Sequence, residues 1–216
     1  HSTYLSVISI FCFILALKTN INLYWLILPI ILGFSFLTKQ APTGHIFIII
    51  LILSLLHFTF NFDIKKLTFG IMGSFFTFFL FFFLINYFEI PFENFIDQYI
   101  LFPLSLGESR LEYLFPIEFQ RIFMRFKLIH LSAFILLYIL VKKLFKKIGY
   151  IKNNEFLILL SLIGMYFSLI VHQLMTINGL FVFFIIPILI GFSHLYFENN
   201  FTNKKYIIYF LLLLNL

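Results

Sequence analysis

Apolar runs alternate with short polar connectors along the whole chain. The runs cover residues 4–17, 21–37, 45–60, 67–87, 128–144, 156–171, 175–197 and 206–216. Several are shorter than the roughly 20 residues that span a bilayer comfortably. Because helices satisfy their own backbone hydrogen bonds inside a membrane, the pattern predicts an all-α, polytopic transmembrane bundle. We expect about eight spans in a single membrane domain covering residues 1–216.

The longest connector, residues 88–127, has a helical periodicity of its own. After Pro91 an apolar face alternates with a polar one at helical spacing. The apolar set is Phe92, Phe95, Ile96, Tyr99 and Ile100, and the polar set is Glu93, Asn94, Asp97 and Gln98. This pattern suits a helix in the membrane interface that ends at Pro103. We expect a loop over residues 104–110, and then a short helix from Pro116 with Phe119, Ile122, Phe123 and Phe126 inward and Glu118, Arg121 and Arg125 outward.

Composition supports a membrane protein. The chain is 62% hydrophobic and 11% charged, with 35 phenylalanines, whereas a soluble domain is about half apolar and a quarter charged. The single cysteine, Cys12, rules out an intramolecular disulfide. A net charge of +6 would suggest nucleic-acid binding in a soluble protein. Here the cations lie mostly in short connectors, where they set topology, so we expect no nucleic-acid partner.

The lysines are distributed unequally between the two sides that alternating spans define. One side holds Lys18, Lys65, Lys66, Lys142, Lys143, Lys146, Lys147, Lys152, Lys204 and Lys205. The positive-inside rule makes that side cytoplasmic. The opposite side holds Lys39, the 88–127 connector and a predicted turn at His172 and Gln173. The polar residues that could take part in binding or catalysis are therefore predicted to lie on the extracytoplasmic side.

The two ends suggest an internal fragment of a longer protein. The chain begins at His1 rather than Met, and it stops at Leu216 inside an apolar run.

Lys39 is the strongest candidate for a functional residue. It lies between two apolar runs together with Gln40 and His45, at a break that contains Pro42 and Gly44. A cation at this depth is costly unless it meets an anion or water, and lysine binds phosphate as a point charge. We interpret the group as a phosphate or pyrophosphate site. The alternative is a lysine that anchors a helix end by snorkelling, but Lys39 departs from the positive-inside trend.

Four further residues are candidates for binding substrate. Arg110 could clamp a phosphate, or it could be a solvated charge paired with Glu108 or Glu112. Asp97 could orient a sugar hydroxyl, or simply solvate the polar helix face. His172, with Gln173, could bind phosphate or a substrate hydroxyl, or be a histidine wetted at a helix end.

Other chemistries find no support in the sequence. His57, His130 and His194 have no partner at metal-ligand spacing, and there is no Cys/His cluster, glycine-rich phosphate loop or nucleophile elbow. We therefore predict no metal site and no evident cofactor, with a divalent cation as an open alternative.

The stretch from Gly33 to Lys39 reads Gly-Phe-Ser-Phe-Leu-Thr-Lys. It resembles the G-x-x-x-L-T-K signature of GT-C-type membrane glycosyltransferases, in particular the dolichyl-phosphate-mannose protein mannosyltransferase and aminoarabinose-transferase group. The stretch from Asn178 to Pro187 matches in part, because Asn178 and Gly179 stand where that group often has Arg-Tyr. The motif match covers about fifteen residues, and the hydropathy match covers most of the chain.

The resemblance implies transfer of a sugar from a polyprenyl-phosphate carrier to a lipid, glycan or protein acceptor. It places the protein in a bacterial inner (plasma) membrane, with the site facing outside. By position, Lys39 would neutralise the donor or leaving-group phosphate. The family's acidic base lies in a first extracytoplasmic loop, which would lie upstream of this fragment.

Rival functions remain open at this point. A cell-envelope glycan polymerase or ligase would depend on Arg110 and Arg121 more than on Lys39. A transporter or flippase would carry ionisable residues near the bilayer midplane, whereas these apolar runs are almost free of charge. A structural membrane subunit would tolerate loss of Lys39.

Overall fold

The computed structural model of the chain describes residues 2–114, 118–145, 153–176 and 181–200. Within these ranges the protein is all-helical, with no strand. Four helical segments are long and apolar enough to cross a membrane: Gln40–Phe60, Ile64–Tyr87, Asn154–Thr176 and Val182–Asn199. The chain divides into two compact units, His1–Tyr113 and Leu114–Leu216. The all-helical prediction is therefore confirmed for the described residues, and the four long apolar helices are compatible with an integral membrane protein.

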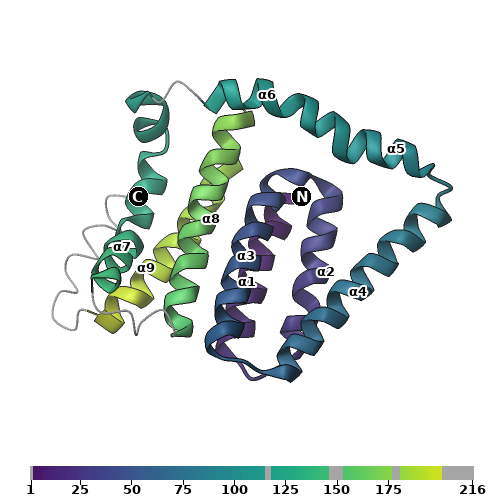
Figure 1. Ribbon diagram of the computed structural model, residues 1–216. Coiled ribbons are helices and arrows are strands. Elements are labelled where there is room, and N and C mark those ends of the chain that lie inside the picture. Colours follow the sequence, from purple (N-terminus) through teal and green to yellow (C-terminus); the bar gives the residue numbers. More distant parts are fainter. Residues whose placement is uncertain (1, 115–117, 146–152, 177–180, 201–216) are drawn as a thin grey trace. The chain divides into compact units, whose positions relative to one another are not determined.

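The first unit begins with four antiparallel helices (Figure 1). They are α1 (Ser2–Lys18), α2 (Leu23–Thr38), α3 (Gln40–Phe60) and α4 (Ile64–Tyr87). Side chains tie the helices together at both ends of this bundle. The Ser6 hydroxyl lies 3.1 Å from the Ser35 hydroxyl at one end. At the other end the Trp25 ring stacks on His57, with centroids 5.4 Å apart. Lys39 and the Lys65–Lys66 pair consequently lie at opposite ends.

Local chemistry explains where two of these helices begin. Lys39 has an extended backbone, with φ −170° and ψ 131°, and Ala41 is also non-helical. The residue before a proline is disfavoured in the helical region, so Pro42 separates the regular part of α3 from α2. At the start of α4 the Asp63 side chain accepts hydrogen bonds from the backbone N–H groups of Lys65 and Lys66, which is a normal N-cap.

Glycine allows α4 to approach α2 closely. A Cβ atom at Gly73 would lie 2.2 Å from the Leu26 carbonyl oxygen and 2.7 Å from Pro29 Cγ. One turn earlier, a Cβ atom at Gly70 would lie an ordinary 3.9 Å from the Trp25 carbonyl oxygen. Small residues at a helix interface let backbones come together in membranes, so this contact depends on Gly73.

The connector after α4 is more helical than its sequence suggests. A helix after Pro91 is confirmed as α5 (Phe92–Ile96), but it continues through a π-helical turn, η1 (Asp97–Leu101), into α6 (Phe102–Leu114). The predicted end at Pro103 and the predicted loop over residues 104–110 are therefore wrong. The Phe102 N–H bonds to the Asp97 carbonyl, five residues back. The regular hydrogen bonding of an α-helix, four residues back, is therefore already interrupted next to Pro103, which has no N–H to donate. Proline is tolerated in the first turn of a helix.

The second unit is built on α7 (Lys127–Leu144), α8 (Asn154–Thr176) and α9 (Ile186–Asn200), with a 3₁₀ turn, η4 (Phe181–Ile185), before α9. The Ser193 hydroxyl of α9 donates to the Ser132 carbonyl of α7 at 2.8 Å. At the end of α7, the Lys143 ammonium lies 3.6 Å from a carboxylate oxygen of Glu155 in the first turn of α8. These contacts join the three helices into one packed body.

Several predictions in this unit are wrong. His172 and Gln173 do not form a turn but lie buried inside α8, which ends at Thr176. Met175 and Thr176 of the predicted span 175–197 belong to α8, and the candidate span that follows is Val182–Asn199. Phe119 and Phe123 are exposed rather than inward. Arg121, in the π-helical turn η2 (Gln120–Met124), is not an outward charge, because it donates to the Leu174 carbonyl at 3.2 Å.

Other predictions fall on residues outside the described ranges. These are the last apolar run, 206–216, and the start of a helix at Pro116.

Candidate functional site

Lys39 occupies an exposed position at the junction of α2 and α3. Its backbone N–H closes α2 by bonding to the Ser35 carbonyl at 3.2 Å. Among the residues that the structure describes, no carboxylate lies within ion-pair distance of its ammonium. The N-terminal end of α3 follows at once, and helix N-termini carry partial positive charge. The junction is therefore a locally positive surface without a counter-charge among its described neighbours.

Gln40 and the η1 turn hold this junction from one side. The Gln40 side-chain amide donates to the Tyr99 carbonyl. In return the Tyr99 hydroxyl donates to the Leu37 carbonyl at 3.2 Å. Asp97 is exposed two residues before Tyr99. The structure thus brings the Asp97–Tyr99 segment to the end of α2, next to Lys39 and Gln40.

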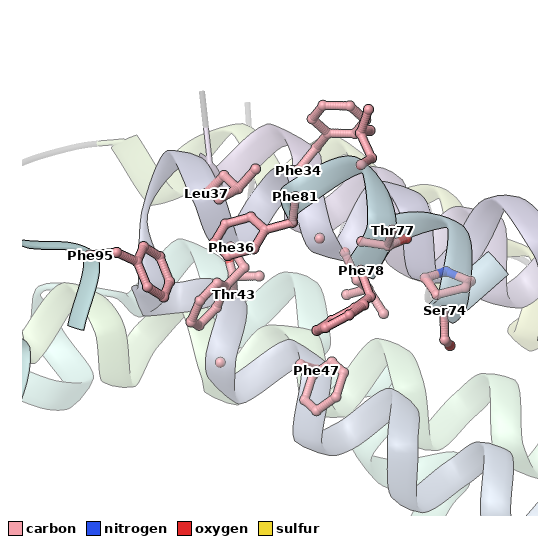
Figure 2. A pocket seen from close by; sticks show the side chains of 15 residues that line it. Phe34, Phe36, Leu37, Thr43, Phe47, Ser74, Thr77, Phe78, Phe81 and Phe95 are labelled. Atoms are coloured by element: carbon pink, nitrogen blue, oxygen red, sulfur yellow. The ribbon is translucent and has the colours of Figure 1, made fainter. Parts of the chain in front are cut away.

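An apolar cavity lies against the same junction. Its volume is about 490 Å³, and α2, α3, α4 and α5 all contribute to its wall. Figure 2 shows the aromatic side chains around it: Phe34, Phe36, Phe47, Phe78, Phe81 and Phe95. Leu37 and Thr43, which flank Lys39 in sequence, also line it. A positive group and an apolar cavity are therefore neighbours on one helix junction.

Gly33, the first residue of the signature stretch, has a packing role in this wall. A Cβ atom at Gly33 would lie 2.2 Å from Cγ2 of Thr77 on α4. A side chain at Gly33 would require Thr77 to move, so glycine eases the close approach of α2 and α4. Both Gly33 and Thr77 line the cavity.

His45 lies half-buried in the first turns of α3. Its Nδ1 atom is buried and has no hydrogen-bond partner among the described residues. A buried unpaired polar atom is costly, so this imidazole is a group that a bound ligand or a water molecule would satisfy. His45 stays a candidate beside Lys39.

The remaining candidates lie on other helices, α6 and α8. Arg110 is partly exposed on α6 of the first unit. His172 and Gln173 belong to the second unit, where they are 9% and 5% exposed. The Nε2 atom of Gln173 is buried and has no partner among the described residues.

Sequence reasoning missed the cavity and the part that Tyr99 plays. Helical periodicity places Tyr99 only on the apolar face of a helix, because its contact with Leu37 joins residues that are 62 positions apart. Aromatic residues at 34, 36 and 47 on either side of Lys39 were the available signal, but periodicity alone cannot tell a cavity wall from a lipid-facing surface.

In the described ranges no group of three or more His, Cys, Asp or Glu residues is placed to hold a metal ion. Comparison with protein-family models, with curated proteins and with solved structures finds no match.

Proposed function

We propose that this chain carries the donor site of an integral-membrane glycosyltransferase that uses a sugar linked to a polyprenyl phosphate. One observation supports the proposal above all others. An exposed lysine without an acidic partner among the described residues adjoins an apolar cavity of about 490 Å³. A polyprenyl phosphate combines the same two features, an anionic head and an apolar chain.

The phosphate of the donor would lie at the α2–α3 junction. The Lys39 ammonium offers three hydrogen-bond donors and a full charge, and the start of α3 adds partial positive charge. When the sugar is transferred, negative charge develops on the leaving phosphate oxygen. A fixed cation at that point stabilises the transition state. His45, with its unpaired Nδ1, is placed three residues into the regular part of α3 as a second polar group.

The prenyl chain would lie in the apolar cavity. Of its aromatic lining, Phe47, Phe78 and Phe81 come from α3 and α4, both long and apolar enough to cross a membrane. Thr43 stands between the cavity and the Lys39 carbonyl. A prenyl chain bound here would remain in the hydrocarbon layer of the membrane. No soluble protein would be needed to deliver it.

The lysine distribution gives the proposed orientation. In the first unit Lys18, Lys65 and Lys66 lie at the end of the bundle opposite to Lys39. The positive-inside rule makes their end cytoplasmic, so donor binding would take place on the outer face of the membrane. In this proposal the chain crosses the bilayer about eight times, and α5 and η1 lie in the outer interface.

Binding of a defined prenyl phosphate tests the proposal. The purified chain in detergent is titrated with farnesyl phosphate and, in parallel, with uncharged farnesol. We expect Lys39→Ala to weaken farnesyl phosphate binding by about 10-fold or more, since charge-assisted hydrogen bonds contribute about 1.5–3 kcal/mol. Farnesol binding should not change.

Lys65→Ala is the matched control, because it removes the same charge from an exposed position at the opposite end of the bundle. Equal weakening by Lys39→Ala and Lys65→Ala would mean a general charge effect. Unchanged farnesyl phosphate binding in Lys39→Ala would refute the proposed donor site.

A further inference from the structure

Three buried hydroxyl groups, one each from α1, α2 and α3, meet next to the Lys39 junction. Ser6 and Ser35 are fully buried and Thr43 is 1% exposed. The Ser35 and Thr43 hydroxyls lie 2.8 Å apart, and Ser6 lies 3.1 Å from Ser35 and 3.3 Å from Thr43. We call these three residues the hydroxyl cluster. Buried hydroxyls need partners, and here the three helices supply them to one another.

The cluster ends on the backbone of Lys39. The Thr43 hydroxyl lies 2.9 Å from the Lys39 carbonyl oxygen. Each hydroxyl has one proton to donate. If Thr43 donates to Lys39, the 2.8 Å contact requires Ser35 to donate to Thr43, and Ser6 then donates to Ser35. The order of donation is therefore Ser6 to Ser35 to Thr43 to the Lys39 carbonyl.

The reverse order uses longer contacts. If Thr43 donated to Ser35, Ser35 would donate to Ser6 at 3.1 Å or to the Ser2 carbonyl at 3.2 Å. Ser6 would then donate to Thr43 at 3.3 Å, and the 2.9 Å hydrogen bond to the Lys39 carbonyl would be lost. The forward order uses contacts of 3.1, 2.8 and 2.9 Å instead. Shorter O–H···O contacts are the stronger ones, and hydrogen bonds in a chain polarise one another. The forward order is consequently favoured.

We infer that the hydroxyl cluster is a positioning element for Lys39, and that Thr43 is its central residue. This inference rests on the proposed donor site. Lys39 has an extended backbone between two helices and is the N-cap of α3, so its carbonyl lies at the first turn of that helix. The Thr43 hydroxyl adds a side-chain hydrogen bond to this carbonyl, while the same residue forms part of the cavity wall. The cluster thereby holds the backbone from which the Lys39 side chain extends, next to the apolar cavity.

A purely structural role would have a different signature. Hydroxyls between membrane helices also hold helices together, and their loss then lowers stability without acting through Lys39. Positioning predicts that loss of the hydroxyl matters only while the ammonium is present. A double-mutant cycle separates the two roles, because coupled residues show non-additive effects.

The experiment titrates farnesyl phosphate into the detergent-solubilised full chain with Thr43→Val, Lys39→Ala and both changes together. Valine keeps the shape of threonine without the hydroxyl. We expect Thr43→Val to weaken binding by about fivefold, as for loss of one hydrogen bond, and to add nothing in the Lys39→Ala background. Thr43→Ser should restore binding to within about twofold, because it keeps the hydroxyl.

Thr59→Val is the matched control on α3, since that exposed hydroxyl donates only to the Leu56 carbonyl of its own helix. It should leave binding unchanged. If Thr43→Val does not fold, Ser6→Ala tests the start of the chain of donors, with an expected loss of about twofold. Equal losses from Thr43→Val with and without Lys39, or no loss at all, would overturn the positioning role. If Lys39→Ala alone has no effect, the donor site itself fails.

Discussion

Helices α4 and α8 are both long and apolar enough to span a bilayer, but the share of residues that is buried differs greatly between them. Within α4, all 24 residues of which are described, only Gly73 is buried. Within α8, 15 of 23 residues are buried, and all of these are likewise described. Length and hydropathy therefore do not show how deeply a helix is packed.

The difference lies in the residue types that make the contacts. α8 buries large side chains such as Leu159 and Met165, both 0% exposed. α4 meets α2 through its backbone, and six of its eight phenylalanines are more than half exposed: Phe75, Phe76, Phe78, Phe79, Phe82 and Phe83. In a bilayer, lipid tails solvate such side chains as well as a protein core does. We therefore expect α8 to lose stability when a buried side chain is made smaller. We expect α4 to lose stability when the glycine that contacts α2 gains a side chain.

The largest effect should come from emptying the core around α8. Leu159→Ala should lower the free energy of unfolding by about 3 kcal/mol, the usual cost of a cavity left by a buried leucine. Phe79→Ala, on the open face of α4, should cost less than about 1 kcal/mol although it removes more atoms. Unfolding of both variants in detergent, followed by circular dichroism, measures the difference. Similar losses from the two variants would mean that α4 and α8 are covered alike.

A smaller effect should follow from adding a single methyl group to α4. Gly73→Ala places a carbon where the Leu26 carbonyl oxygen and Pro29 Cγ leave no room. We expect a loss of about 2 kcal/mol, as for overpacking. Gly70→Ala is the control one turn away, where the nearest atom is 3.9 Å from the added carbon. It should leave stability unchanged or raise it by about 0.5 kcal/mol, because alanine favours the helix. A tolerated Gly73→Ala would show that backbone contact does not hold α4 to α2.

The sequence predicted most of what depends on neighbours along the chain. The break at Lys39, the helix after Pro91 and the apolar helices all follow from proline positions and runs of hydrophobic residues. The predicted loop over residues 104–110 is wrong, because a low apolar content does not by itself exclude a helix. The Ser105 hydroxyl instead bonds back to the Phe102 carbonyl at 2.8 Å, which lets serine remain inside a helix.

What the sequence did not predict depends on contacts between distant residues. The cavity beside Lys39 needs side chains from four helices. Periodicity places Arg121 on an outer face, but it donates to a carbonyl 53 residues away. Which side of a helix meets another helix, and which meets lipid, is decided by packing that an apolar run alone does not encode.

The smallest expected effect is at Arg121, which donates a hydrogen bond to the last turn of α8, the well-packed helix. The last four carbonyls of a helix have no partner within it, and the Leu174 carbonyl in the last turn of α8 accepts from the Arg121 guanidinium. Arg121→Met keeps the apolar stem and removes the donors, so we expect a loss of about 1 kcal/mol. Hydrogen exchange should increase at the amides near the end of α8 and not at its start. Arg125→Met, at an exposed arginine over the Phe126 ring, should leave those amides unchanged. Equal protection in both variants would mean that the contact with Leu174 contributes nothing to the stability of α8.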